Sequence, residues 1–411
     1  MGGVRTVSVE YLSQTVANLP GVPRVVASGN FATPHVALQA VDTGAEAYRL
    51  FMLNAQHDLP DREGVTLETP FVGPGMRRSS RLRYIPSRLS MVPLLFAHQA
   101  KPDIVLLHTS PPRHGRVSMG TEVNILPAAV EAARARGALV VAQVNPQMPY
   151  TYGDGEIGVS DVDLAVEVDE LLPSPPSGTP NEVSLGIGAQ VAELVPDGAT
   201  LQAGIGGVPD AVLASLTGRR RLRVWAEMFS DGVLALEAAG ALDADRELVT
   251  SFLIGSPELY RWLDGNQRVR VLRTERVNDP AMIARNPHMV SVNTALEVDL
   301  FAQANASRIN SRIYSGFGGQ TDFIVGARHS PGGQAVMALP SWHPKADVST
   351  VVPRIDEPVT SFQPSMIVTE QGVAELWGCS QDEQAAAIIE AAAHPRVREE
   401  LRHEAKVRGL G

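Results

Sequence analysis

The chain has 411 residues, a formal net charge of −10 and a single cysteine, Cys379. Hydrophobic residues make up 44% and charged residues 19% of the chain, which is typical of a soluble globular protein with more than one domain. The negative charge argues against binding to nucleic acid or to a membrane surface. One cysteine excludes an internal disulfide and a cysteine-rich zinc site. Because the N-terminus lacks a secretory pattern and no apolar run approaches a membrane span of about 20 residues, we expect a cytoplasmic protein.

Short apolar runs typical of strands alternate with helical patterns along the chain. In the first part, strands are predicted at 24–27, 48–53, 103–108, 138–144 and 164–168, and helices at 34–42, 124–136 and 180–194. Strands 200–203 and 222–225 and helices 209–216 and 231–239 follow. The stretch 380–409 is helical with one break at His394-Pro395. This alternation predicts an α/β fold with a largely parallel sheet and helices on both faces.

A proline- and serine-rich stretch at 172–180 is the best candidate for a domain boundary. We place one domain at 1–176 and the second at 177–411. The segments 29–38 and 204–213 share a glycine after a strand, a proline five positions later and then a helical pattern. The similarity favours a duplicated α/β unit, with two similar open domains and an active site at their interface.

A glycine-rich segment, Gly204-Ile205-Gly206-Gly207-Val208, follows the predicted strand 200–203. Glycines allow close approach of a ligand, and the N-terminus of the following helix offers free N–H groups to a phosphate. A plain tight turn is about as good an interpretation. The segment is not a dinucleotide fingerprint because Pro209 takes the sixth position, and it lacks the lysine of a P-loop.

A second glycine cluster, at 315–323, has three glycines within four positions. Backbone N–H groups without side-chain shielding suit an oxyanion hole, whereas the alternative is a flexible loop. The helical pattern that starts at Thr321 favours an ordered loop. In the first half, the equivalent loop carries Asn30, which either donates to an oxyanion or only occupies a turn.

Glu227 follows the predicted strand 222–225 and precedes Ser230-Asp231-Gly232, a turn with a candidate helix N-cap. A carboxylate at a strand exit of an α/β fold faces the crevice in which such folds bind ligands. For an isolated glutamate, capping or a salt bridge would be the better interpretation. The histidines, among them His108, His114 and His394, lack metal-ligand spacing, so we expect no metal site.

The order and spacing of these motifs resemble the acetyl-CoA hydrolase/transferase family, which includes acetate, butyrate, succinate and 4-hydroxybutyrate CoA-transferases. The resemblance rests on 204–209, 227–232 and 315–323. It extends roughly from Val25 to Ala405 through the similar segments 110–112, 143–149, 166–170, 293–300 and 368–374.

The family resemblance implies two similar α/β domains, with CoA bound mainly by the second, and a glutamate that forms a covalent thioester with CoA. Glu227 matches that glutamate, while Gly319 and Asn278 match groups beside the thioester. The implied CoA contacts are Gly204, Ile205, Gly206, Gly207, Val208, Gly318, Ser341 and Lys345, and the implied substrate pocket includes Asn30, Phe31 and Trp225. Coenzyme A is then a substrate, no cofactor is tightly bound, and the protein is a homodimer.

The expected function is a CoA-transferase that exchanges CoA between a short-chain acyl-CoA and a carboxylate such as acetate. An acyl-CoA hydrolase is the first alternative, and a non-catalytic acyl-CoA-binding protein is the second. A nicotinamide oxidoreductase fails the fingerprint. Two departures from the family pattern bear on acyl specificity: Trp225-Ala226 precede Glu227, and Glu370-Gln371-Gly372 stands where relatives often have Glu-Tyr-Gly.

Overall fold

The computed structural model describes residues 4–175 and 180–411 and groups them into two compact units. Unit 1 contains the described residues up to Pro175, together with Val249–Val277 and Ile313–Gly318. Unit 2 contains the described residues from Pro180 to Leu248, Asn278–Arg312 and Gly319–Gly411. The predicted boundary stretch falls partly outside the described residues, and the division at residue 176 stays a prediction.

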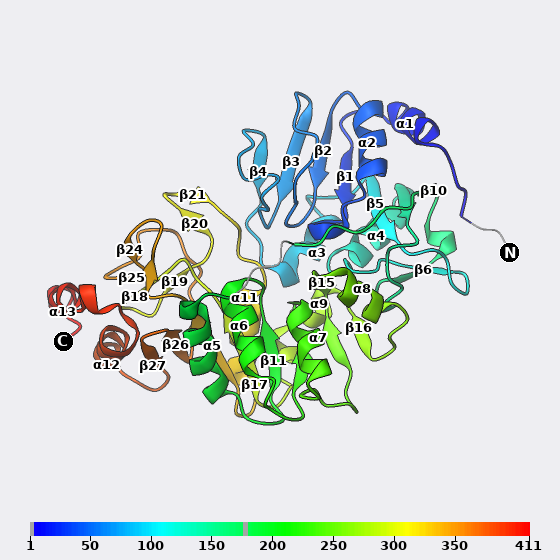
Figure 1. Ribbon diagram of the computed structural model, residues 1–411. Coiled ribbons are helices and arrows are strands. Elements are labelled where there is room, and N and C mark those ends of the chain that lie inside the picture. Colours follow the sequence, from blue (N-terminus) through cyan, green and yellow to red (C-terminus); the bar gives the residue numbers. More distant parts are fainter. Residues whose placement is uncertain (1–3, 176–179) are drawn as a thin grey trace. The chain divides into compact units, whose positions relative to one another are not determined.

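Unit 1 is built on a parallel sheet with the strand order β10-β7-β5-β1-β2-β3-β4 (Figure 1). The strands are β1 (Arg24–Ala27), β2 (Tyr48–Phe51), β3 (Val65–Thr69), β4 (Leu82–Tyr84), β5 (Ile104–Thr109), β7 (Leu139–Val144) and β10 (Leu164–Glu167). Strand β5 is buried at every position, as expected of a parallel strand with both faces covered. Leu12 of the first helix joins Val25, Leu50 and Ile104 in one apolar core.

The helices of unit 1 are α1 (Val9–Ala17), α2 (His35–Gly44), α3 (Val92–Ala97), α4 (Leu126–Arg134), α8 (Pro257–Leu263) and α9 (Thr274–Val277). Short 3₁₀ turns lie at Asn30–Ala32, Leu89–Met91 and Val159–Asp161. Smaller strands are β6 (Arg116–Ser118), β8 (Tyr152–Gly153), β9 (Glu156–Gly158), β15 (Phe252–Leu253) and β16 (Val269–Val271). Strands β14 (Leu248–Thr250) and β21 (Arg312–Ile313) lie where the chain passes between the units.

Unit 2 has a sheet in the order β27-β26-β22-β17-β11-β12. Its strands are β11 (Thr200–Ala203), β12 (Arg223–Trp225), β17 (Met289–Asn293), β22 (Gln334–Ala338), β26 (Met366–Thr369) and β27 (Gly372–Glu375). All of these pair in parallel except β27, which pairs antiparallel with β26. The two units therefore share the α/β character expected from the sequence.

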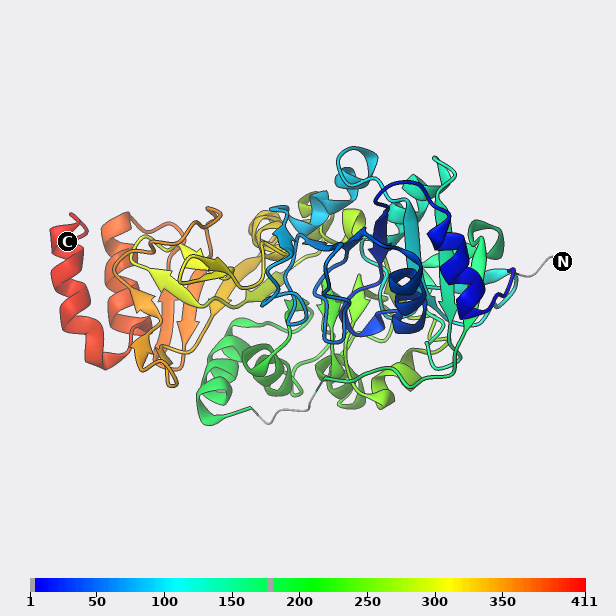
Figure 2. The ribbon, with the colours of Figure 1, turned by 90° about the horizontal axis from the view of Figure 1, so that it is seen from above.

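The helices of unit 2 are α5 (Glu182–Leu194), α6 (Gly207–Ser215), α7 (Asp231–Ala238), α10 (Pro280–Ile283), α11 (Gln320–His329), α12 (Gln381–Ala387) and α13 (Arg398–Val407). A π-helical turn (Ile388–Ala392) and a 3₁₀ turn (Pro395–Val397) separate α12 from α13 at the predicted break (Figure 2). The remaining short strands are β13 (Met228–Phe229), β18 (Glu297–Asp299), β19 (Ala304–Asn305), β20 (Arg308–Ile309), β23 (Trp342–His343), β24 (Val348–Ser349) and β25 (Val351–Val352).

Each sheet reverses its strand order at one central strand. In unit 1, β1 lies between β2 and β5, and in unit 2, β11 lies between β12 and β17. Open α/β sheets bind ligands outside the carboxyl ends of the strands at such a reversal. The chain leaves β1 through Gly29-Asn30, β11 through the glycine loop at Gly204, and β12 directly before Glu227. A ligand-binding site is therefore expected at these three strand exits.

No helix in the described part of the chain is both long enough and apolar enough to cross a membrane.

Two glycines of α5 make a direct test of the packing of α5 against α6. A Cβ at Gly188 would lie 2.6 Å from the Ala211 carbonyl oxygen, whereas a Cβ at Gly186 would approach Glu370 only to 3.5 Å. We expect Gly188→Ala to lower the free energy of unfolding by about 1–3 kcal/mol through overpacking. Gly186→Ala should be neutral or stabilising by up to about 1 kcal/mol, because alanine favours the helix. Urea unfolding of both variants measures the difference, and equal stabilities would contradict the packing described.

Candidate active site

Glu227 lies between two short strands of unit 2, after β12 and before β13. Its neighbours Ala226 and Met228 are buried, with 2% and 5% of their surface exposed. The apolar neighbours hold the backbone against the core, and the carboxylate is the polar group that this segment presents. The side chain of Glu227 is itself only partly exposed.

Two nitrogen donors meet the Glu227 carboxylate. The Asn278 amide Nδ2 donates to Oε2 at 2.7 Å, and the backbone N–H of Gly319 also bonds to the carboxylate. A Cβ at position 319 would lie 1.7 Å from Oε2 and 2.1 Å from Asn278 Nδ2. Only glycine can therefore place its backbone N–H at this distance from the carboxylate. All three residues belong to unit 2.

Local structure explains the position of both donors. Asn278 is fully buried and precedes Asp279, whose side chain caps the short helix α10 by accepting from the Ala281 N–H. Gly319 is the N-cap residue of α11, so its N–H belongs to the end of a helix that carries a positive partial charge. The starts of α10 and α11 thus position the two donors that bond to the Glu227 carboxylate.

The surroundings of Glu227 act in both directions on its acidity. Desolvation raises the pKa of Glu227 to about 7, the hydrogen bond from Asn278 lowers it, the nearby charge of Asp322 raises it, and the Gly319 N–H lowers it. Asp322 lies in the first turn of α11 and is 1% exposed. At neutral pH the carboxylate is then close to its titration midpoint, where a small change in its environment changes the ionised fraction most.

The glycine loop forms the exposed start of α6. Gly206 is the N-cap residue of α6. Its φ of 114° is a backbone conformation that favours glycine. Ile205, Gly206 and Gly207 are exposed, and Val208 is buried under the loop. The first N–H groups of a nine-residue helix are thus open to an anionic group.

The other residues predicted to contact CoA have different surroundings. Ser341 is buried and donates both its N–H, at 2.9 Å, and its hydroxyl to the Glu370 carboxylate. Desolvation would raise the pKa of Glu370, but the hydrogen bonds from Ser341 and Gln371 hold it below its usual value. Lys345 is exposed between β23 and β24. Gly318 belongs to unit 1, where its carbonyl accepts from the Leu89 N–H at 2.9 Å.

The three residues predicted to line the substrate pocket are divided between the units. Trp225 is the last residue of β12 and is partly buried. Asn30 and Phe31 form the turn after β1 in unit 1. Asn30 is 2% exposed, and its Nδ2 donates to Glu122, whereas Phe31 is partly exposed. Their part in substrate binding stays a prediction.

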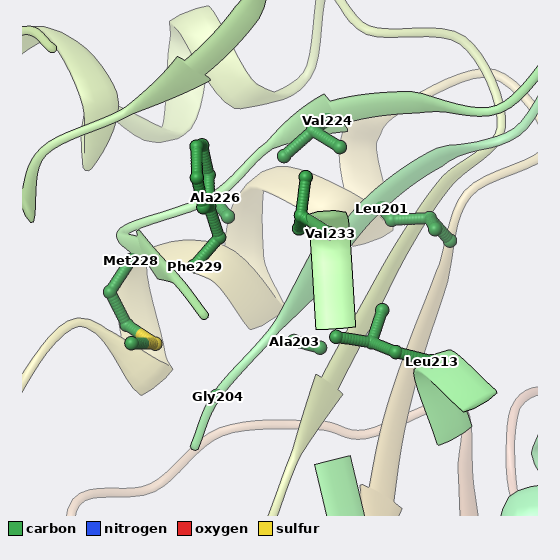
Figure 3. Close-up of a pocket in the computed structure, with 9 residues that line it drawn as sticks. All are labelled: Leu201, Ala203, Gly204, Leu213, Val224, Ala226, Met228, Phe229 and Val233. Atoms are coloured by element: carbon green, nitrogen blue, oxygen red, sulfur yellow. The ribbon is translucent and has the colours of Figure 1, made fainter. Parts of the chain in front are cut away.

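A small apolar cavity lies behind the Glu227 segment. Figure 3 shows its lining side chains, which come from β11, α6, β12 and α7 and from the segment around Ala226 and Met228. Its volume of about 10 Å³ holds about one water molecule. It is a packing gap in the core of unit 2, too small for an acyl group.

Asp322 is the member of this site that sequence reasoning did not single out. It lies within the glycine motif 315–323, three positions after Gly319. Because α11 starts at Gln320, Asp322 lies in the first turn of the helix, less than one full turn of 3.6 residues after the N-cap residue Gly319. The predicted helix start at Thr321 was the available signal.

The sequence of the chain is similar to those of known proteins over most of its length. Residues 54–174 match the N-terminal domain of acetyl-CoA hydrolase/transferase, and residues 255–405 match its C-terminal domain. The chain is 39% identical over 342 residues to the 4-hydroxybutyrate coenzyme A transferase of Clostridium kluyveri, covering 80% of this chain and 79% of the relative. It is 36% identical to the succinyl-CoA:acetate/propanoyl-CoA:succinate CoA transferase of Fasciola hepatica, covering 94% of this chain and 85% of the relative.

The fold agrees with these matches. The crystal structure of RipA from Yersinia pestis superposes with a TM-score of 0.91 at 29% identity, over 99% of this chain and 98% of that one. Both domain matches, the long alignments with named CoA-transferases and the full-length structural similarity lead to one conclusion. The chain belongs to the acetyl-CoA hydrolase/transferase family, and it is an enzyme of the CoA-transferase type.

Proposed function

We propose that the enzyme moves CoA between a short-chain acyl-CoA and a carboxylate such as acetate, through a covalent glutamyl-CoA thioester on Glu227. The observation that carries the proposal is the carboxylate of Glu227 held by Asn278 at 2.7 Å and by the backbone N–H of Gly319. A carboxylate that is positioned by two N–H donors and partly desolvated is suited to nucleophilic catalysis.

The first half of the proposed reaction forms the covalent intermediate. An oxygen of Glu227 attacks the thioester carbonyl of acyl-CoA, the C–S bond breaks, and CoA leaves as a thiolate. This step gives an acyl-glutamyl anhydride. The thiolate then attacks the glutamyl carbonyl, the anhydride C–O bond breaks, and the free acid leaves as a carboxylate. Glu227 is now the acyl part of a thioester with CoA.

The second half runs the same steps in reverse with a different carboxylate. The acceptor attacks the glutamyl thioester, thiolate leaves, and the thiolate attacks the acceptor side of the new anhydride to give the new acyl-CoA and free Glu227. The reaction only moves CoA from one acid to the other and regenerates Glu227, so no tightly bound cofactor is needed. The exposed N–H groups at the start of α6 suit the phosphates of CoA.

The donors on Glu227 serve both states of the site. In the free enzyme they bond to the carboxylate, and during attack the same N–H groups can bond to the oxyanion that develops on the glutamyl carbonyl. The pKa of about 7 matters as well, because a more basic carboxylate is a better nucleophile but is less ionised. A value near neutrality balances these two demands.

Hydrolysis of acyl-CoA is the second candidate function, because the matched family includes hydrolases. Both outcomes can share the glutamyl thioester and differ only in whether water attacks it, which releases free CoA, or a carboxylate attacks it, which gives a new acyl-CoA. Steady-state turnover with acetate, propionate, butyrate, succinate and 4-hydroxybutyrate separates them. We expect turnover to depend on the carboxylate, and turnover unaffected by every acceptor would establish the hydrolase. We also expect the enzyme to act as a homodimer.

The contact at position 319 predicts a severe loss of activity for Gly319→Ala. Its Cβ would overlap Glu227 Oε2 at 1.7 Å and displace the N–H donor, which costs about 100- to 1000-fold in kcat when such a donor is removed. Gly218→Ala is the matched control, because a Cβ there meets no atom within 4 Å. Both variants are compared by kcat and by thermal unfolding. A folded Gly319→Ala variant with the kcat of the wild type would disprove the role of this N–H.

The raised pKa of Glu227 predicts the pH profile. Because the ionised form attacks, kcat/KM should fall about tenfold per pH unit below a midpoint near the pKa of about 7. Replacing Asp322 by Asn removes a like charge that raises this pKa, so the midpoint should move to lower pH. Profiles of wild type and Asp322→Asn between about pH 5 and about pH 9 test both statements. A wild-type profile that stays flat down to about pH 5 would contradict them.

The covalent thioester predicts inactivation by borohydride only after an acyl-CoA has been added. Borohydride reduces a thioester to an alcohol, which would remove the carboxylate of Glu227 permanently. Enzyme treated with borohydride without acyl-CoA is the control and should keep its activity. Activity that survives treatment in the presence of acyl-CoA, or normal activity of Glu227→Ala, would refute the covalent role.

A further inference from the structure

The buried glutamate Glu122 lies in unit 1 and belongs to a network of asparagines. Glu122 is 2% exposed. The Nδ2 of Asn30 lies 2.9 Å from its Oε1 and 2.7 Å from its Oε2, and the Nδ2 of Asn124 donates to Oε1 at 2.7 Å. The backbone of Gly29 adds a further hydrogen bond. The carboxylate is thus surrounded by N–H donors on both oxygens, the arrangement that a buried anion requires.

The network continues from Glu122 to the neighbouring strand exit. The Oδ1 of Asn30 accepts from Asn54 Nδ2 at 2.7 Å, and the Asn30 N–H donates to the Leu53 carbonyl at 3.2 Å. A Cβ at Gly29 would lie 2.1 Å from that same carbonyl oxygen. The turns that follow β1 and β2 are therefore in direct contact, and Glu122 holds them through Asn30.

Both turns have a backbone that needs to be held. Asn30 and Asn54 have φ of 48° and 42°, in the left-handed region that non-glycine residues adopt at a cost in free energy. Asparagine is among the residues that tolerate it best. The side-chain amide of Asn30 uses its donor on Glu122 and its acceptor on Asn54, so its rotamer and the direction of the turn are fixed together.

Apolar side chains would fill this place at lower cost than a buried carboxylate, because desolvation of an ion is expensive. Desolvation raises the pKa of Glu122 to about 7, and the hydrogen bonds from Asn124, Asn30 and Gly29 lower it. A fully satisfied buried polar network rigidifies its surroundings and specifies one geometry. The segment whose geometry this network fixes most directly is the turn Asn30–Ala32, because Asn30 belongs to both.

This turn lies at the carboxyl end of β1, where the strand order of unit 1 reverses. It carries Phe31, which is partly exposed between the buried Asn30 and Ala32. The buried neighbours anchor the turn, and Phe31 between them keeps part of its surface exposed. Moving the turn would move this ring.

We propose that Glu122 is a positioning residue that fixes the Asn30–Ala32 turn and thereby sets the preference for the carboxylate substrate through Phe31. The inference rests on the proposed CoA transfer. According to this proposal, the preference for the acid depends on the buried hydrogen bonds of Glu122 as well as on the residues that contact the acid. Glu122 itself touches no substrate.

Glu122→Gln tests the proposal because it keeps the shape and changes one acceptor oxygen into a donor. In either orientation the new NH2 group faces a donor: Asn30 Nδ2 when it takes the position of Oε2, or both Asn30 Nδ2 and Asn124 Nδ2 when it takes the position of Oε1. We expect KM for the acceptor carboxylate to rise by about tenfold or more, with a changed order among acetate, butyrate and 4-hydroxybutyrate. Borohydride trapping at Glu227 with saturating acyl-CoA should stay within about twofold of wild type, because Glu122 does not contact Glu227. Glu63→Gln, at an exposed position of the same unit, is the matched control and should change nothing.

The double variant Glu122→Gln with Asn30→Asp exchanges donor and acceptor across the same contact. The amide introduced at position 122 can then donate to the carboxylate introduced at position 30 and accept from Asn124, while Asn54 still donates to position 30. Because Asn30 is itself a predicted pocket residue, this variant should restore the wild-type order among the acids relative to Glu122→Gln rather than full activity. A structural role alone would leave the order of acids unchanged in Glu122→Gln while lowering stability.

Should Glu122→Gln fail to fold, Asn54→Ser removes one link from a partly exposed position and should raise the same KM to a smaller extent. Unchanged acceptor KM values in the folded Glu122→Gln or in Asn54→Ser, or a double variant no better than the single one, would overturn the proposal. Absence of exchange in the wild type with every acid would instead overturn the proposed function itself, so the two failures are distinguishable.

Discussion

The site depends on one close contact, in which the backbone N–H of Gly319 lies so near the Glu227 carboxylate that a Cβ would be 1.7 Å from Oε2. No side chain other than hydrogen is compatible with that approach. The same space admits the amide of Asn278, which bonds to the same oxygen at 2.7 Å. The chemistry proposed for this enzyme needs a carboxylate whose position and acidity are both set before substrate arrives, and this contact contributes to both.

Three segments far apart in the sequence meet at that contact. Glu227 leaves β12, Asn278 precedes α10, and Gly319 caps α11. Asn278 and Gly319 are the first residues with which the chain returns to unit 2 after passing through unit 1, so only Glu227 comes directly from a strand of the unit 2 sheet. Helix α11 contributes twice, because its N-cap N–H lowers the pKa of Glu227 and Asp322 in its first turn raises it. The resulting value near neutrality comes from opposing effects, with desolvation the largest.

Each unit holds one glutamate in a similar way. The pKa of this glutamate is raised to about 7 by desolvation, and the carboxylate accepts hydrogen bonds from one asparagine amide (Glu227) or two (Glu122) and from the backbone N–H of a glycine. Glu227 remains partly exposed, as its proposed nucleophilic role requires, whereas Glu122 is buried and bonded to the turn that carries Phe31. The first arrangement suits reaction with a substrate, and the second suits fixing a loop.

Periodicity in the sequence predicted most of the elements that carry these loops. Strand β11 was predicted with its observed bounds, Thr200–Ala203, and α7 to within one residue, because glycine and proline mark their ends. Strands β17 (Met289–Asn293) and β22 (Gln334–Ala338) were not predicted. In β17, Val290 and Val292 alternate with polar residues, which was an available signal for a strand, whereas the alanines of β22 have little strand preference. Predicted helix 124–136 is shorter, Leu126–Arg134.

The candidate site was predictable only in part. Glu227, Gly319 and Asn278 were grouped through the family resemblance, and the structure places them within one hydrogen-bonded contact. Nothing in the local pattern indicates that Asn30 gives its amide to Glu122, because that bond joins residues 92 positions apart. Polar partners brought together by tertiary packing leave no periodic signal in a single sequence.

The most direct measurement follows the oxygen atoms of the acceptor. If Glu227 exchanges CoA through an anhydride, a single turnover of the CoA-loaded enzyme with ¹⁸O-labelled acetate transfers one labelled oxygen to the Glu227 carboxylate. Mass spectrometry of the peptide that contains Glu227 should then show one ¹⁸O atom, and the same peptide from enzyme mixed with labelled acetate alone should show none. Formation of acetyl-CoA without label in that peptide would contradict the central claim.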